Sequence, residues 1–314
     1  MLGFTLVAPL MAIIITGNLL RKYGFYSESD IKTLTKTLYW VILPPLLFRT
    51  TFISGKELLV QSHLLISLNL CYIFSIAAAW TCAALFLHRG DRKRIAVSAF
   101  ACIRSNNIYL GFPVMYLAQG DIGLHNSSVY LAVSTISFQL FSILVGELVM
   151  SGKLSKKSAH TIVKRVVTNP LVVACVFGVV AAFLGPDKLP KVLDEPMKLM
   201  GNAATAVALL ALGGTLDLSR MSRVIRMIRS TWGDILLKVI LHPALMYFFL
   251  TIFPVPRPLL QATVMLSSMP TAVNCFIVAR EMDMDGDYAA DIVASTTVLG
   301  ALTIPIWAKI LEII

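Results

Sequence analysis

Charged residues are scarce in this chain. Only 14% of its 314 residues are Asp, Glu, Lys or Arg, whereas about 25% is usual in a soluble domain, and 57% are hydrophobic. A water-facing surface cannot be built from this mixture, so a soluble globular protein is excluded. Lipid is the solvent that suits such a composition.

The sequence also lacks the signatures of catalytic and metal sites. It has no H-E-x-x-H or G-x-S-x-G motif and no Cys/His constellation. The five cysteines lie in apolar runs without C-x-x-C spacing, so neither a disulfide framework nor a zinc site is expected. Asp283-Met-Asp-Gly-Asp resembles a calcium loop, but its glycine stands at the fourth position instead of the sixth. We therefore expect no enzyme activity, no cofactor and no metal.

Apolar runs of about 20 residues recur along the whole chain, and this is the length that crosses a bilayer core as a helix. A β-barrel would show alternating segments, whereas Val7–Leu20 and Leu171–Leu184 are continuously apolar. No cleavable signal peptide is expected before Arg21, so the first run should be retained. The ten expected spans are 3–20, 33–52, 60–87, 95–118, 127–150, 167–184, 195–216, 231–253, 257–280 and 288–312.

Basic residues cluster between alternate spans, which predicts the orientation of the chain. The arrangement places both termini outside a cell (inner) membrane. It also explains the net charge of +10 without a nucleic-acid partner. The expected cytoplasmic clusters are Arg21, Lys22, Lys32 and Lys36; Arg89, Arg92, Lys93 and Arg94; Lys153, Lys156, Lys157, Lys164 and Arg165; and Arg220, Arg223, Arg226 and Arg229.

Two halves of five spans each would point in opposite directions, as in inverted-repeat transporters. The expected divisions are repeat 1 at 1–150, a basic cytoplasmic linker at 151–165, and repeat 2 at 166–314. The openings of the two halves are weakly alike, with Val7-Ala-Pro-Leu in one and Asn169-Pro-Leu-Val in the other. The sequence thus predicts an all-α integral membrane fold of ten helices in two inverted repeats.

The fourth span of each half carries polar residues and a proline inside an apolar run. The first reads Arg104-Ser-Asn106-Asn107 and continues to Gly111 and Pro113, and Asn106 lies roughly 16 Å past Ile95 at 1.5 Å per residue. The second contains Pro270 and Asn274. Interrupted helices are tolerated at membrane depth only where they are buried or line a cavity. Two such breaks predict a site at the bilayer midplane, where helix ends and amides suit an anion; kinked, packed helices are the alternative.

Several ionisable residues allow more than one interpretation. Arg104 could pair with a substrate carboxylate, pair with Glu147, or reach toward the cytoplasmic interface. His242 could carry a coupling proton, although a packed polar core histidine is the simpler interpretation. Asp234 and Lys238 are one helical turn apart, which predicts an interfacial ion pair.

These residues give the chain a resemblance to the auxin efflux carrier family in its compact bacterial form. The resemblance spans nearly the whole chain and rests on Asn107, Leu110, Gly111 and Pro113, on Pro270 and Asn274, and on the closing stretch from Ala294 to Trp307. It implies crossing broken helices 4 and 9, with Asn107 and Asn274 lining the substrate. It also implies a homodimer, a scaffold of spans 1, 2, 6 and 7, and a moving unit of spans 3–5 and 8–10.

The functional prediction is a secondary transporter of small organic anions, such as auxin-like acids, malonate or malate, with elevator-type alternating access. One alternative is a sodium-coupled carrier like the bile-acid symporters, with Ser267, Ser268, Thr271 and Gln139 as candidate sodium ligands. Another is a membrane receptor that does not transport. The linker 151–165 is too short for the large regulatory loop of the plant proteins.

Overall fold

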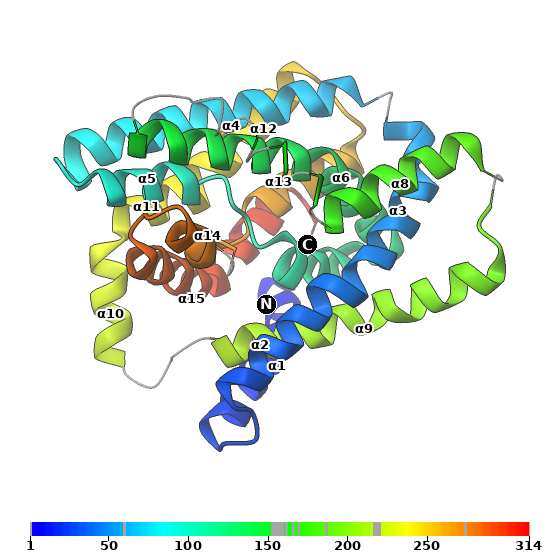
Figure 1. The fold of residues 1–314 in the computed structure, drawn as a ribbon, viewed down its shortest axis with the longest axis horizontal. Helices are drawn as coiled ribbons and strands as arrows, with labels where there is room; N and C mark the ends of the chain where they lie inside the picture. The colour runs from blue at the N-terminus through cyan, green and yellow to red at the C-terminus, as the bar shows by residue number, and fades with distance from the viewer. Residues whose placement is uncertain are drawn as a thin grey trace.

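The computed structural model describes residues 2–58, 61–151, 160, 163–164, 167–168, 170–185, 188–215, 221–272 and 275–313. Within these residues the regular structure is helical, apart from one isolated antiparallel bridge. In Figure 1, α3, α8 and α9 lie toward the right, while α5, α11, α14 and α15 gather at the left. The helices are α1 Leu2–Lys22, α2 Glu28–Thr37, α3 Leu43–Leu58, α4 Ser62–Cys82, α5 Arg92–Ala101, α6 Phe112–Ser151, α8 Pro170–Leu184, α9 Lys191–Thr215, α10 Met221–Ser230, α11 Trp232–Leu236, α12 His242–Ile252, α13 Arg257–Ser267, α14 Cys275–Glu281 and α15 Gly286–Ile310.

Four π-helical turns connect some of these helices. They are η1 Leu38–Ile42, η2 Ala83–Leu87, η3 Asn107–Gly111 and η4 Leu237–Leu241. A π-helical turn inserts an extra residue into the helical repeat, and such turns are frequent at functional sites. Two of them, η3 and η4, contribute to the site described below.

Four helical segments in the described part of the chain are long and apolar enough to cross a membrane: Ser62–Leu87, Lys191–Gly214, Trp232–Ile252 and Gly286–Ile310. Large apolar side chains such as Phe74, Phe86, Phe248 and Leu302 are exposed on the outside, where lipid would cover them. The all-α membrane class is therefore confirmed. The count of ten spans and the inverted repeat remain predictions.

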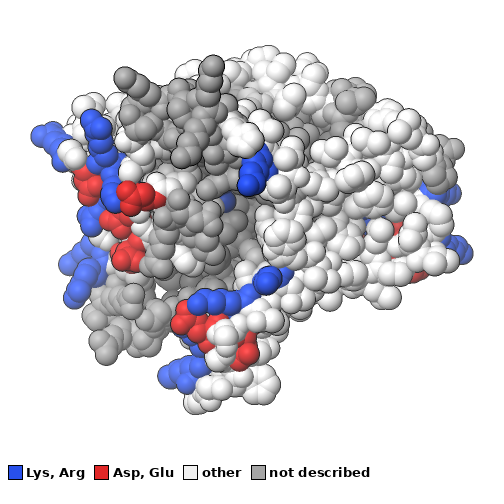
Figure 2. All heavy atoms as spheres, in the orientation of Figure 1, with Lys and Arg blue, Asp and Glu red and all other residues white. Residues whose placement is uncertain are grey.

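The charged side chains are concentrated at the ends of the molecule. In Figure 2, Lys and Arg, with Asp and Glu among them, gather along the left and lower edges, while the broad right-hand face is nearly all white. The lower edge includes the start of α2, where Ser27 caps the helix and accepts a hydrogen bond from the Asp30 amide. Such a distribution suits a protein whose middle lies in lipid and whose ends face water.

Small residues let α1 and α3 pack closely on α9 and α8. A Cβ atom at Gly213 of α9 would lie 1.9 Å from the Ile14 carbonyl oxygen of α1, and one at Gly178 of α8 would lie 2.0 Å from Thr51 Oγ1 of α3. Close backbone approach through small residues is the usual way in which helices associate in lipid. These contacts join α1, α3, α8 and α9.

The connection predicted between the spans at 95–118 and 127–150 is very short. The segment α6 consists of two helices that meet at a kink, where Gly120 has non-helical backbone angles with φ +61°. A left-handed backbone conformation is easily adopted by glycine because it has no Cβ atom. The chain therefore turns between these two spans at a single kink.

Candidate functional site: two paired helix interruptions

The helices break in both segments where the sequence predicts interruptions. In the first, α5 ends at Ala101 and helical structure resumes at Asn107. In the second, α13 ends at Ser267 and α14 begins at Cys275. Pro113 is the second residue of α6, directly after the π-helical turn η3, and Pro270 lies within the second break.

The two interruptions are hydrogen-bonded to each other. Ser105 and Thr271 form an antiparallel bridge. On either side of it, the Asn106 amide donates to the Pro270 carbonyl at 2.8 Å, and the Ala272 amide donates to the Arg104 carbonyl at 2.8 Å. Backbone groups released by each break are thus satisfied by the other break, as burial away from water requires. We call residues 102–106 and 268–272 the crossover.

A third helix supports the crossover. The Thr271 amide points away from Ser105 and donates to Thr296 Oγ1 of α15 at 3.1 Å. Both threonines are fully buried. Pro270 packs on the same helix, because a Cβ atom at Gly300 would lie 2.7 Å from Pro270 Cγ. The glycine predicted as part of the site, Gly111, has a similar role on the other side: a Cβ atom there would lie 2.4 Å from Leu266 Cδ2 of α13.

The two asparagines of the first break are buried at the crossover. Asn106 is 1% exposed, and neither its side-chain oxygen nor its side-chain nitrogen has a hydrogen-bond partner among the described residues. Asn107 opens η3, is 7% exposed and lies within hydrogen-bonding reach of the Tyr130 hydroxyl, while its Oδ1 has no partner in the described part of the chain. Leaving such a group unsatisfied costs about 1–3 kcal/mol, so a buried amide without partners indicates a place for a polar ligand.

Lys238 of η4 contacts the crossover, contrary to the interfacial position predicted for it. Its side chain is fully buried, and Nζ donates to Ser105 Oγ at 2.6 Å and to the Ser267 carbonyl at 3.1 Å. The interfacial pair predicted with Asp234 does not form. The sequence does contain a signal for this role of Lys238: an ionisable residue inside an apolar span by default marks a functional position.

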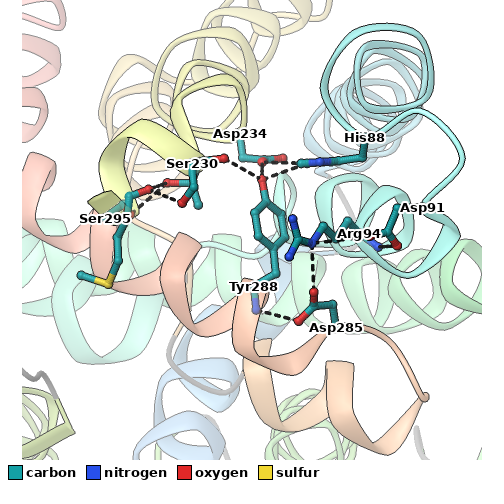
Figure 3. Close-up of polar contacts among 10 residues, drawn as sticks. His88, Asp91, Arg94, Ser230, Asp234, Asp285, Tyr288 and Ser295 are labelled. Carbon is teal, nitrogen blue, oxygen red and sulfur yellow. Dashed lines mark hydrogen bonds and ion pairs between the residues drawn. The ribbon is translucent and has the colours of Figure 1, made fainter. Parts of the chain in front are cut away.

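Asp234 belongs instead to a polar cluster at the charged end of the molecule (Figure 3). Its carboxylate accepts a hydrogen bond from the Tyr288 hydroxyl of α15, and His88 Nε2 lies 2.9 Å from that hydroxyl. The Tyr288 amide and Arg94 both donate to Asp285. Partial burial opposes ionisation of Asp285, but these two hydrogen bonds outweigh it and lower the pKa of its carboxyl group.

Arg104 belongs to the crossover, and its buried side chain is partly enclosed by aromatic rings. Its guanidinium carbon lies 4.8 Å from the ring centre of Phe100 and 5.1 Å from that of Phe138, and Nη1 is 3.4 Å from Ser142 Oγ. Contacts over two aromatic faces stabilise a desolvated cation. The alternative in which Arg104 reaches the interface is wrong, because the side chain is 3% exposed.

His242 lies in a buried polar group of its own, formed with Ser75 and Cys71. Its Nδ1 is 2.9 Å from Ser75 Oγ, and its ring stacks on Tyr72 with centres 5.9 Å apart. This environment is the packed core that the simpler interpretation predicted. The other proposed proton-coupling residue, Glu147, lies in α6, but its side chain is outside the described part of the structure, and Asn274 falls outside the described residues altogether.

Among the candidate sodium ligands, the hydroxyls of Ser267 and Ser268 have partners, whereas Thr271 Oγ1 is buried and has no partner among the described residues. The hydroxyl groups of Ser267 and Ser268 donate to carbonyls of their own helix at 2.8 and 2.7 Å. The Ser267 carbonyl accepts from Lys238. The side chain of Gln139 is outside the described part of the structure. The sodium-coupled alternative stays an untested prediction.

A bundle of apolar helices with two paired interruptions and buried polar groups at their meeting point defines a multi-pass membrane transport protein. The comparison with family models agrees, since the model described as "Membrane transport protein" matches residues 2–308. The chain therefore belongs to this family, that of the auxin efflux carriers.

Curated relatives are similar over almost the whole chain. A protein of Rhizobium meliloti named "Putative malonate transporter" is 26% identical over 305 residues, covering 95% of this chain and 92% of that protein. An uncharacterized transporter of Methanothermobacter thermautotrophicus is 24% identical, with 97% of each chain covered. An uncharacterized transporter of Methanocaldococcus jannaschii is 21% identical, with 99% of each covered.

Proposed function

We propose that this protein is a secondary transporter of small organic anions, and that its substrate binds at the crossover. The observation that carries the proposal is the buried Asn106 amide, which has no side-chain partner among the described residues and stands between two paired helix breaks. A carboxylate accepts hydrogen bonds from such an amide and from backbone amides at a helix start. Helix α6, preceded by η3, begins at this point and directs its N-terminus toward the crossover.

The proposed substrates are carboxylates, including malonate, malate and auxin-like acids. The name of the Rhizobium meliloti relative supports a carboxylate, and the buried cations Lys238 and Arg104 near the crossover favour an anion over a neutral or cationic solute. Transport, and not catalysis, is the proposed activity.

Alternating access would move one group of helices against another. The proposed scaffold consists of α1, α2, α3, α8 and α9. The proposed transport unit consists of α4 to α6 and α11 to α15. The close packing of α1 on α9 and of α3 on α8 supports the scaffold part of this division. Two inverted five-span repeats, a homodimer built on the scaffold, and termini outside the cell (inner) membrane are parts of the same proposal.

The transport proposal is tested by exchange of labelled solute in proteoliposomes. Vesicles loaded with unlabelled malonate, malate or indole acetate should accumulate the matching radiolabelled acid, and protein-free vesicles should not. Asn106→Ala and Asn107→Ala should each lower this exchange, because they remove the amide groups that would bind the carboxylate.

A control away from the crossover, just beyond the Gly120 kink of α6, separates site effects from general damage. Asn126→Ala changes an asparagine whose side chain, among the described residues, donates to the Ile122 carbonyl one turn earlier at 2.9 Å, and it should exchange like the wild type. If Asn106→Ala and Asn107→Ala, shown to be folded, exchange at the wild-type rate, the crossover is not the substrate site. Binding itself can be screened by thermal shift with a panel of carboxylates, since a ligand of the folded state raises its stability.

A further inference from the structure

Lys238 is a buried lysine with no anionic neighbour among the described residues. Its ammonium group donates to one hydroxyl and one carbonyl, and no carboxylate lies within ion-pair distance of it among the described residues. Asp234, one turn earlier, is bonded to Tyr288. An ammonium has three donor hydrogens, so two are used here and one is left.

The protein environment compensates this charge only in part. The Ser267 carbonyl belongs to the last turn of α13, where the helix carries a partial charge of roughly −0.5. This partial negative charge favours a cation, but it is smaller than the full positive charge of an ammonium group. A buried unpaired charge costs several kcal/mol, and an anionic partner with hydrogen bonds offsets most of that cost. While Lys238 is protonated, the charge at the crossover is therefore not balanced without an anion.

The position of Lys238 links this charge to the unpaired amide. Nζ contacts Ser105, the bridge residue directly before Asn106, and the Ser105 hydroxyl in turn donates to the Ser267 carbonyl at 3.2 Å. Lys238 thus bonds to both segments that lead into the breaks, one residue along the chain from the asparagine whose side chain has no partner among the described residues. A carboxylate has two oxygens and can accept from a donor on each side.

Building on the proposed transport function, we propose that Lys238 is the counter-ion of the substrate, binding one carboxylate oxygen while the Asn106 amide binds the other. The ligand class is then a compound that presents one carboxylate to the crossover. A neutral amide of the same shape would leave the ammonium without its partner. Lys238 would also occupy oxygen atoms that a coupling sodium ion would need, so uptake should not require sodium.

The test compares acids with their amides in the purified full-length protein. Affinities for malonate and malonamide, and for indole acetate and indole acetamide, are measured by calorimetry in Lys238→Met, Lys238→Arg and the wild type. Lys238→Met should weaken binding of the acids by about 10- to 100-fold, the range that one hydrogen bond to a charged group contributes, and change amide binding less than about twofold. Lys238→Arg keeps the positive charge and should weaken binding of the acids less than Lys238→Met does.

The matched control removes a lysine outside the crossover. Lys93 lies at the start of α5 and pairs with Asp283 at 2.9 Å on an exposed surface. Lys93→Met has the same change in net charge as Lys238→Met and should bind acids like the wild type. If Lys238→Met binds the acids as tightly as Lys93→Met does, the counter-ion assignment is wrong.

A measurement on the wild type covers the case in which Lys238→Met does not fold. Solid-state NMR with ¹³C-carboxylate malonate and ¹⁵N-lysine protein measures the distance from the carboxylate carbon to the lysine nitrogen. A charge-assisted contact of 2.7–2.9 Å between N and O places these nuclei about 3.5 Å apart. A bound malonate with no lysine nitrogen at that distance overturns the proposal.

These outcomes separate the two proposals. If the wild type binds the acids, and Asn106→Ala weakens this binding while Lys238→Met does not, the proposed substrate site stands. In that case only the assignment of Lys238 as the counter-ion is refuted. A folded wild type that neither binds nor exchanges any of the acids would contradict the proposed function, and the counter-ion assignment would fail with it.

Discussion

Thr296→Val tests whether the crossover depends on support from α15. Valine has nearly the shape of threonine, so the change removes the hydroxyl group and little else. Thr296 Oγ1 is the acceptor for the Thr271 amide at 3.1 Å, and among the described residues that fully buried amide has no other acceptor. The substitution should therefore leave a backbone N–H of the crossover without a partner.

The expected cost follows from the burial of that amide. A buried donor that loses its partner destabilises a protein by about 1–3 kcal/mol. At about 2–4 °C per kcal/mol, the melting temperature should fall by about 2–12 °C. The next residue provides the control: Thr297 is also buried, and its hydroxyl donates only to the Val293 carbonyl one turn earlier, at 2.7 Å. Thr297→Val should change stability by less than about 0.5 kcal/mol, because such back-bonding adds little to a helix.

The assay is thermal unfolding of both variants in the same detergent, with hydrogen exchange of the Thr271 amide as a local readout. Thr296→Val should melt at a lower temperature than Thr297→Val and exchange that amide faster. Equal melting temperatures and equal exchange would refute the claim that α15 holds the second break in place.

Three further changes test the packing and the helix ends. Gly213→Ala would place a Cβ atom 1.9 Å from the Ile14 carbonyl oxygen and should lower stability by about 1–3 kcal/mol in thermal unfolding, whereas Gly214→Ala meets only a flexible side-chain end and should cost less. Ser27→Ala removes the N-cap of α2 and should cost about 1 kcal/mol in the same assay; an unchanged melting temperature would contradict the capping role. The pKa of Asp285 is lowered from its ordinary 3.8, so its carboxylate stabilises the fold above that pH and the contribution is lost as the pH falls through the folded value; Asp285→Asn should therefore show a smaller loss of stability between pH 5 and pH 3, roughly, than the wild type.

The breaks could be predicted from the sequence because local chemistry determines them. Pro270 lacks an amide hydrogen and disfavours helical geometry before it, and two adjacent asparagines are unusual in an apolar run. What the sequence could not provide is the partner of each break. The bridge between Ser105 and Thr271 joins residues 166 positions apart, and only the packing of the helices brings them together.

The error at Lys238 has a physical explanation. A spacing of four residues places two side chains on one face of a regular α-helix, which is why Asp234 and Lys238 looked like a pair. The π-helical turn η4 begins at Leu237, between them, and its extra residue per turn changes the direction of the side chains that follow. Asp234 then bonds to Tyr288, a residue more than 50 positions away, which no local pattern indicates.

The central claim is that a carboxylate binds where the two interrupted helices meet, and locating a bound ligand tests it most directly. Crystals of the protein with bromomalonate, measured near the bromine absorption edge, would show the bromine position independently of any assumption about the site. The account predicts an anomalous peak beside Asn106 and Lys238. A peak elsewhere, with the crossover free of ligand, would contradict it.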